Sequence, residues 1–164
     1  MRAMLAEYAL TGAGASLVFR SFMEAALDQA RAAGLRGEVP VGAVIVLDGQ
    51  IIAAAGNRTR ELCDPTAHAE VLVIRAACTA LGSERLPGHD LYVTLEPCPI
   101  CAGTIAAARI ARLYYGAADP KSGGVAHGAR VFSHPQCHHV PEVYDGIAGA
   151  AAEALLKDFF AAKR

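Results

Sequence analysis

An alternation of strand and helix patterns is the feature that most constrains how this chain folds. Residues 90–117, "DLYVTLEPCPICAGTIAAARIARLYYGA", contain two apolar runs typical of buried strands, with a proline-initiated helical segment between them. We predict strands over 90–96 and 109–117, and a helix over 97–108. Because the links are short, the two strands should pair in parallel through a right-handed crossover.

Two further apolar runs flank Asp48-Gly49, a dipeptide that favours the type I′ turn of a β-hairpin. They predict strands over 40–47 and 50–56. Apolar spacing predicts the remaining elements: a helix over 22–33, a helix between Asp64-Pro65-Thr66 and Gly82, a strand near 140–145 and a helix over 147–162. This order predicts an α/β fold, a three-layer α/β/α domain with a central mixed sheet of about five strands.

Capping residues and apolar spacing also predict the ends and the buried faces of the helices. Ser21 and Glu24 have the spacing of a capping box, and Gly34 follows the last apolar position of the first helix. The inward-facing residues are expected to be Val71, Ile74, Cys78 and Leu81 on the second helix and Leu155, Leu156 and Phe159 on the last.

Length and hydropathy are typical of one globular domain. The chain has 164 residues, and although 54% of them are hydrophobic, no uninterrupted apolar run is long enough to span a membrane. We expect a soluble protein with no membrane partner. Residues 1–20 resemble a mobile N-terminal tail more than a signal peptide, because Glu7 interrupts the apolar stretch, so the domain is expected over 21–164.

Cysteine usage and charge limit the compartment and the partners. The five cysteines are odd in number and unequally spaced, which does not fit a disulfide framework and favours a reducing, cytoplasmic location. The formal net charge is -1, so the chain has no strong overall positive field for holding nucleic acid. A nucleic-acid partner would have to be bound by local basic groups.

Three residues offer the ligand atoms that zinc prefers. His68 supplies an imidazole nitrogen, and Cys98 and Cys101 supply two thiolates as C-x-x-C. Both cysteines lie at a predicted helix start, where the helix dipole favours thiolates, and His68 lies in the first turn of another predicted helix. Two helix N-termini could therefore meet at the C-terminal edge of the sheet, where open α/β sheets bind ligands.

Glu70 raises the question of whether the zinc site is catalytic. On a helix, Glu70 and His68 would lie about 200° apart, so both can serve only a target beyond the helix end. A catalytic zinc keeps one position for water, and a nearby carboxylate can take the proton of that water. A structural zinc instead needs a fourth protein ligand, and spacing leaves four candidates: Cys63, His134, His138 and His139.

The order H-x-E followed by P-C-x-x-C resembles the zinc-dependent cytidine deaminase-like superfamily, for which this signature is already described. Within it, the chain is similar to the bacterial tRNA-specific adenosine deaminases over about residues 20–164. The matching pieces occur in order: "EVPVGAVIV", "GNR", "DPTAHAE", "LYVTLEPCPICAG", "RI", "YYGAADPKSGG", "HP" and "DFF".

The resemblance implies a cytidine deaminase-like fold and hydrolytic deamination of adenosine to inosine at the wobble position of a tRNA anticodon. It implies one zinc ion per subunit, held by His68, Cys98 and Cys101, which activates a water while Glu70 acts as catalytic proton shuttle. It also implies a homodimer whose substrate is the anticodon stem-loop of a tRNA. The substrate-binding residues that it implies are Asn57, Ala69 through its backbone N–H, Asp119, Lys121, Phe159, Lys163 and Arg164.

Several of these positions have simpler alternatives. Asn57 also fits a turn residue after a strand, Phe159 fits a core residue, and Lys163 and Arg164 fit a solvated tail. The chain departs from many family members at Gly56, where they have tryptophan, and at Ala161, where they have arginine. The first difference changes the expected wall of the substrate pocket. The second weakens the inference that the end of the chain binds RNA.

Two other functions share part of this pattern. A deaminase of a free base or nucleoside, of the guanine or cytosine type, would use the same zinc ligands and Glu70. A non-catalytic zinc-stabilised module would show a fourth protein ligand such as Cys63 in place of water. A basic surface around residues 119–124 would favour tRNA as the substrate, and a closed, neutral entrance to the active site would favour a small molecule.

Overall fold

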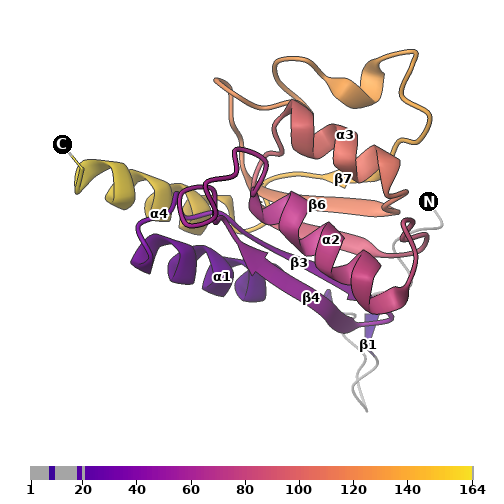
Figure 1. Cartoon of the computed structure of the whole chain (residues 1–164), viewed down its shortest axis with the longest axis horizontal. Helices are drawn as coiled ribbons and strands as arrows, with labels where there is room; N and C mark the ends of the chain where they lie inside the picture. The colour runs from indigo at the N-terminus through magenta and orange to yellow at the C-terminus, as the bar shows by residue number, and fades with distance from the viewer. Residues whose placement is uncertain (1–7, 10–17, 20, 164) are drawn as a thin grey trace.

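A five-stranded mixed sheet forms the centre of the computed structural model, which describes residues 8–9, 18–19 and 21–163 (Figure 1). Its order is β4-β3-β5-β6-β7, with β3 antiparallel to both neighbours and β5, β6 and β7 mutually parallel. The strands are β3 (Gly42–Leu47), β4 (Gln50–Gly56), β5 (Asp90–Leu95), β6 (Arg112–Ala117) and β7 (Glu142–Tyr144). The predicted mixed sheet of five strands is confirmed.

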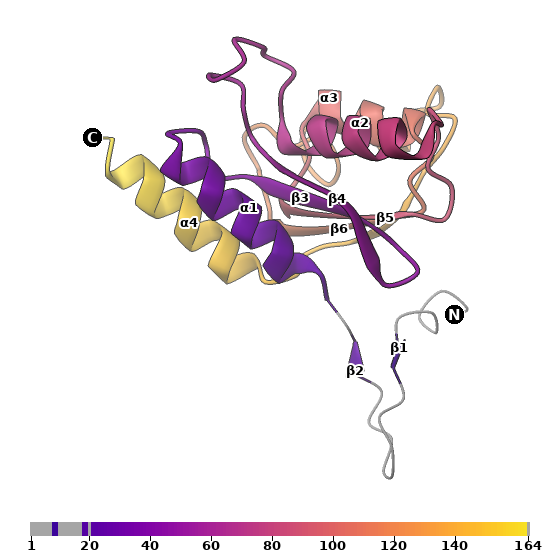
Figure 2. The same ribbon diagram turned by 60° about the horizontal axis from the view of Figure 1, so that its bottom comes forward.

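Four helices cover the two faces of this sheet (Figure 2). They are α1 (Met23–Leu35), α2 (Ala69–Leu81), α3 (Pro99–Ala107) and α4 (Gly149–Ala161), and a short 3-10 turn, η2, spans Val131–Ser133. Alternate residues of β3 point to opposite faces, so Ala43 and Ile45 pack with α2 and α3, while Val44 and Val46 pack with α1. The predicted three-layer α/β/α arrangement is therefore confirmed.

The N-terminal region adds a separate pair of short antiparallel strands, β1 (Tyr8–Ala9) and β2 (Val18–Phe19). The rest of the predicted tail over residues 1–20 lies outside the described residues, so the boundary at residue 21 stays a prediction. No helix of the described part of the chain is long and apolar enough to cross a membrane.

The direction of the strands brings three loops to one edge of the sheet. Because β4 and β5 are both antiparallel to β3, they run in the same direction, and β6 is parallel to β5. The carboxyl ends of β4, β5 and β6 therefore lie at one edge. The chain leaves these ends toward α2, toward α3 and into the loop that begins after Ala117, respectively.

Two glycines let α1 approach the hairpin backbone closely. Gly42 and Gly56 are register partners, and a Cβ on Gly42 would lie 2.1 Å from the carbonyl oxygen of Ala26. A Cβ on Gly56 would lie 2.6 Å from the carbonyl oxygen of Gln29. Since any side chain would push the helix away, close packing against α1 explains the glycine at position 56.

The hairpin turn and the strands follow the predictions, whereas the starts of two helices do not. Asp48 and Gly49 have φ values of 48° and 74°, as the type I′ turn requires. Helix α2 begins at Ala69 instead of near Asp64, because the Asp64 carboxylate accepts hydrogen bonds from the N–H and hydroxyl of Thr66 and forms a local turn. Likewise, α3 begins at Pro99 instead of Pro97.

The predicted capping box does not form, because the N-cap of α1 is Phe22. The Ser21 hydroxyl accepts a hydrogen bond from the N–H of Met23 at 3.1 Å, but the Glu24 carboxylate pairs with Arg31 at 2.8 Å. Helix α1 also continues through Gly34 to Leu35, and the left-handed residue that follows it is Gly37. An exposed arginine thus draws the Glu24 side chain away from the helix start.

The predicted inward faces are partly right. Val71 and Ile74 are buried, and Leu155 and Leu156 pack against the cores on the two faces of the sheet. Leu81 is 45% exposed, because it is the last residue of α2 and lies beyond the sheet contact. The buried contact of α4 is a small residue, Ala152, which apolar spacing based on large side chains does not reveal.

Candidate metal centre

His68, Cys98 and Cys101 come together at the sheet edge where β4 and β5 end. His68 Nδ1 lies 3.5 Å from Cys98 Sγ and 3.4 Å from Cys101 Sγ, and the three ligand atoms all lie within 4.8 Å of one another. Zinc bonds of about 2.0 Å to nitrogen and 2.3 Å to sulfur, at a tetrahedral angle, place N and S about 3.5 Å apart. The donor set and its spacing therefore fit a single zinc ion.

The backbone of the two helix starts explains this convergence. His68 and Cys98 are both N-cap residues with extended backbone, with φ and ψ of -72° and 151° for His68 and -71° and 172° for Cys98. The sequence placed His68 in a first helical turn, and that placement is wrong. An N-cap side chain is not fixed to a helix face, so His68 and Glu70 are free of the 200° separation that an α-helix would impose.

The cluster has three protein ligands among the residues that the structure describes. The candidate fourth ligands have other surroundings: Cys63 is exposed with its Sγ 3.7 Å from the Arg60 carbonyl oxygen, and His139 Nε2 lies 2.6 Å from the Ile110 carbonyl oxygen. His134 and His138 also lie outside the cluster. Three ligands are typical of a catalytic zinc, whose fourth position takes water or substrate.

Protons compete for the same ligand atoms. The hydrogen bonds with Cys101 and with His68 outweigh the effect of burial and lower the pKa of Cys98 to about 4. The bond with Cys98, together with burial, raises the pKa of Cys101, and the bond with Cys98 also raises the pKa of His68. Zinc must therefore displace protons from Cys101 and His68 when it binds.

Glu70 is a buried carboxyl beside the three ligands. It lies in the first turn of α2, is 4% exposed, and interacts with His68, Cys98 and Cys101. Burial raises the pKa of Glu70 to about 7. A carboxyl group with a pKa near neutral can both take and give a proton under physiological conditions, as general acid–base catalysis requires.

Asn57 links the end of β4 to the start of α2. It is 8% exposed, and its Oδ1 accepts a hydrogen bond of 2.8 Å from the N–H of Ala69. Asn57 is therefore more than a turn residue. The Ala69 N–H is engaged inside the protein, so its implied contact with a base would require exchange of this bond, while the Asn57 NH₂ group remains a donor for an incoming ligand.

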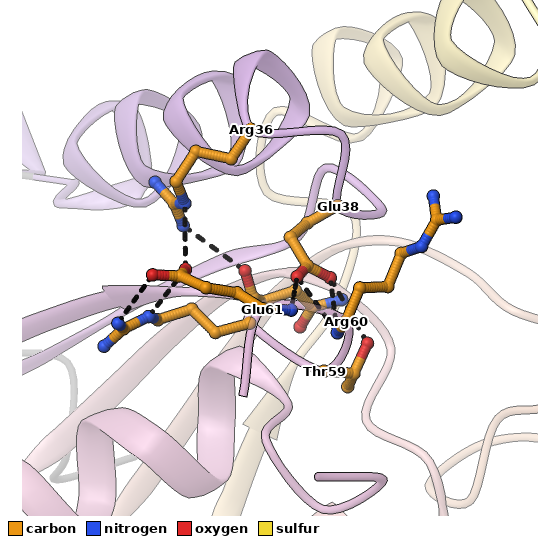
Figure 3. A network of polar contacts seen from close by, with 7 residues as sticks. Arg36, Glu38, Thr59, Arg60 and Glu61 are labelled. Atoms are coloured by element: carbon orange, nitrogen blue, oxygen red, sulfur yellow. Dashed lines mark hydrogen bonds and ion pairs between the residues drawn. The ribbon is translucent and has the colours of Figure 1, made fainter. Parts of the chain in front are cut away.

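The loop between Asn57 and His68 is held by the buried carboxylate of Glu38 (Figure 3). Glu38 is 1% exposed and accepts hydrogen bonds from the N–H of Arg60 at 3.0 Å, the N–H of Glu61 at 2.9 Å and the hydroxyl of Thr59 at 3.2 Å. Burial would raise the pKa of Glu38, but these donors lower it below its usual value. The ionised side chain therefore fixes the path of this loop.

Arginines complete the same network on its exposed side (Figure 3). Arg36 Nη2 donates to the Asn57 carbonyl at 3.3 Å, and Arg36 Nε lies 3.7 Å from the Glu61 carboxylate. Arg58 donates to both oxygens of Glu61 at 2.9 Å. The network connects the end of α1 to Asn57, the residue that precedes the loop leading to His68.

The residues implied in RNA binding lie in two other segments. The Asp119 carboxylate accepts hydrogen bonds from the N–H groups of Lys121 and Ser122, so it shapes its own turn, and Lys121 is exposed. Phe159 is only partly buried and belongs to neither core cluster, so its interpretation as a core residue is wrong. Its ring lies 4.1 Å below Lys163 Nζ, while Arg164 lies outside the described residues.

Two buried glutamates were not predicted from the sequence as part of the site. They are Glu38, described above, and Glu96, whose contacts are described below. Each adjoins a strand in which nearly all residues are buried, Glu38 four residues before β3 and Glu96 directly after β5. An ionisable residue next to a strand that is predicted to be buried is the signal that identifies such groups, because a buried charge requires dedicated partners.

Comparisons with known proteins agree with this geometry. The family described as "Cytidine and deoxycytidylate deaminase zinc-binding region" matches residues 19–117. The chain is 64% identical over 143 residues to a tRNA-specific adenosine deaminase of Agrobacterium fabrum (strain C58 / ATCC 33970), which covers 87% of this chain and 94% of that protein.

Two solved structures are informative. One, from a study of A-to-I editing by tRNA:A34 deaminases at the wobble position of transfer RNA, has 65% sequence identity and a TM-score of 0.81, covering 82% of this chain and 98% of that one. A guanine deaminase from Bacillus subtilis has 33% identity and a TM-score of 0.60, covering 87% and 91% of the two chains.

Replacing Cys98 with alanine should remove zinc and thermal stability together, because zinc binds only the folded ligand set. Elemental analysis of the purified variant should find almost no zinc, and its Tm should fall. The control is Cys63→Ala, which changes an exposed cysteine outside the cluster and should keep both properties. Stoichiometric zinc in the Cys98→Ala protein would contradict the ligand assignment.

Proposed function

Because the chain belongs to the tRNA-specific adenosine deaminases, within the zinc-dependent cytidine deaminase family, we propose that it is a cytoplasmic zinc hydrolase that converts adenosine to inosine at the wobble position of a tRNA anticodon. The observation that carries this proposal is the cluster of His68, Cys98 and Cys101 with the buried carboxyl of Glu70 beside it. The reaction consumes water and releases ammonia.

His68, Cys98 and Cys101 would hold the zinc ion through Nδ1 and the two Sγ atoms, since their spacing fits tetrahedral coordination. When bound, zinc supplies a Lewis acid that lowers the pKa of a coordinated water to about 7. The two sulfur ligands have different surroundings: Cys101 is buried, and Cys98 is partly exposed.

Glu70 would perform both proton transfers. Its carboxylate takes one proton from the attacking water and gives it to N1 of adenine; it then takes the remaining proton of that water from the new C6 hydroxyl and gives it to the amino group, which leaves as ammonia while C6 becomes a carbonyl. To do so it must lie within about 3 Å of both the water and the base. The pKa of about 7 suits a group that must change protonation state twice in each turnover.

Asn57 would bind the extruded nucleoside through its side-chain NH₂ group, and the Ala69 N–H would orient the base after exchanging its bond to Asn57 Oδ1. Residues outside this pocket would contact the anticodon loop, whose unstacked bases suit aromatic side chains and local positive charge. Phe159, near the end of the last helix, and Lys163, just beyond it, provide such a pair. The other proposed RNA contacts are Asp119, Lys121 and Arg164.

A free-base deaminase is the second candidate, because a guanine deaminase shares the fold and 33% identity. The same zinc cluster and Glu70 would serve that reaction. The relatives named for tRNA are about twice as similar, at 64% and 65% identity, which favours RNA as the substrate. A purely structural zinc module is disfavoured, because the cluster has three ligands within the described residues.

Incubation with an anticodon stem-loop that carries a wobble adenosine tests the substrate directly. We expect inosine in that RNA, detected by nucleoside analysis, and no ammonia from free guanine, cytosine or adenosine. A stem-loop with guanosine at the wobble position is the matched control. Ammonia release from a free base, without inosine in the RNA, would replace the proposal with the second candidate.

Replacing Glu70 with glutamine should abolish turnover and leave zinc and fold intact, because it removes the proton carrier and no ligand. General acid–base groups contribute about 10²- to 10⁴-fold to rate, so we expect a loss in kcat of at least that size in a stem-loop assay. Glu84→Gln, which changes an exposed carboxylate at the end of α2 that lies away from the site, should behave like the parent protein. A kcat within tenfold of the parent protein would refute the assigned role of Glu70.

We also propose that the chain forms a homodimer through the outer face of α3. Ile100, Gly103, Thr104 and Ala107 form one helical stripe that is apolar apart from Thr104, and Ile100 is 54% exposed. A cavity of about 450 Å³ lies beside this stripe, lined in part by Gly103, Ala107 and Val131. Small residues and an adjacent hollow suit close packing against a second copy.

Sedimentation equilibrium tests this dimer. The parent chain should have twice the monomer mass at micromolar concentration, and Ile100→Glu should shift it to the monomer, because a charge would be buried in the contact. Leu35→Glu changes an exposed leucine on α1, on the opposite face of the sheet, and should remain dimeric. A monomeric parent chain would exclude the dimer.

A further inference from the structure

Glu96 is a fully buried carboxylate at the edge of the metal centre, two residues before Cys98. Its side chain is 0% exposed, and its backbone N–H donates to the Ala117 carbonyl at 2.8 Å, where β6 ends. Glu96 is not part of the zinc cluster, whose members are the histidine and the two cysteines. Glu96 takes no part in the proton transfers proposed for Glu70.

Within the part of the chain that the structure describes, the hydrogen bonds to this carboxylate all come from one loop, residues 119–127. Oε1 accepts from the backbone N–H groups of Val125 at 3.3 Å, Ala126 at 2.9 Å and His127 at 2.9 Å. Oε2 accepts from the N–H of Asp119 at 3.0 Å and lies 2.7 Å from His127 Nδ1. Both ends of the loop are therefore tied to the same two oxygen atoms.

The chemistry of these contacts makes them strong. Four backbone N–H groups and the imidazole of His127 surround two carboxylate oxygens that are shielded from water. Because an ionised carboxylate only accepts, His127 Nδ1 must be the donor. Hydrogen bonds to a buried charge are stronger than those between neutral groups, so this carboxylate determines the shape of the loop.

The same loop packs on the backbone that leads to the first cysteine ligand. The Gly124 N–H donates to the Pro97 carbonyl at 2.8 Å, and a Cβ on Gly124 would lie 2.8 Å from the Cys98 carbonyl carbon. A Cβ on Gly123 would lie 2.5 Å from Glu96 Oε1. Only glycines allow the loop to lie this close to both Glu96 and the ligand turn.

We propose that Glu96 is a positioning residue, which holds the 119–127 loop against the Cys98 turn so that the RNA-binding residues of the loop keep a fixed place beside the zinc centre. The RNA part of this inference rests on the proposed function. Glu96 touches neither substrate nor metal and acts through Asp119 and the loop backbone. Its loss should therefore weaken RNA binding more than chemistry.

The test variant is Glu96→Gln, which keeps the size of the side chain. In either orientation, the new NH₂ group faces at least one backbone N–H, that of Asp119 or those of residues 125–127, and loses that bond. We expect one zinc per chain as in the parent, kcat for the anticodon stem-loop within threefold, and KM raised about tenfold, as the loss of a hydrogen bond to a charged group implies. Hydrogen exchange at residues 119 and 125–127 should be at least tenfold faster.

Glu38→Gln is the matched control, because Glu38 is also a buried glutamate that accepts backbone N–H groups, but from another loop. Any exchange that it accelerates should be at residues 60–61 and not at 119–127. Gly123→Ala is a second test variant, which displaces the loop from Glu96 Oε1 without removing the carboxylate. It should raise KM in the same way, and it decides the question if Glu96→Gln does not fold.

Two results would overturn the proposal. Unchanged exchange at 119 and 125–127 in Glu96→Gln would show that the carboxylate does not hold the loop. Loss of zinc together with a fall in kcat at constant KM would show that Glu96 supports the metal ligands instead. If the parent protein does not deaminate the stem-loop, the proposed function fails, while exchange and zinc content still decide the role of Glu96.

Discussion

The site depends on the common direction of three strands. Because β4, β5 and β6 end at the same edge of the sheet, the segments that follow them meet there, although they are far apart in sequence. His68 and Cys98 each precede a helix that packs on the same face, and their ligand atoms come within 3.5 Å. Helix α2 is the crossover that joins β4 to β5, and it lets these two strands run in the same direction on either side of β3.

Buried side chains then fix the loops at this edge. Glu38 holds the loop between Asn57 and His68, Asn57 itself is bonded to the first residue of α2, and Glu96 holds the loop after β6. In both glutamates, the penalty of burying a charge is offset by several N–H donors from one loop. Each loop is therefore shaped by a single ionised group, and both groups lie outside the zinc cluster.

The sequence predicted most elements well because their signals are local. Alternation of apolar residues, the Asp48-Gly49 turn and the left-handed Gly82 after α2 depend on neighbouring residues only. The starts of α2 and α3 were predicted too early, at Asp64 and Pro97. There a side-chain turn at Asp64 and the extended N-caps competed with helix propensity, and the packing of the whole domain decided between them.

The sequence by itself determined the fold class and the zinc donor set, because residue type and spacing limit which elements form and which ion is possible. Only the tertiary structure decided that the cluster holds three ligands among the described residues, that the Ala69 N–H is engaged by Asn57, and that Phe159 lies outside the core. It also revealed the roles of Glu38 and Glu96. The physical reason is that partners of a buried charge lie about 20 to 30 residues away along the chain, and spacing within a motif carries no information about them.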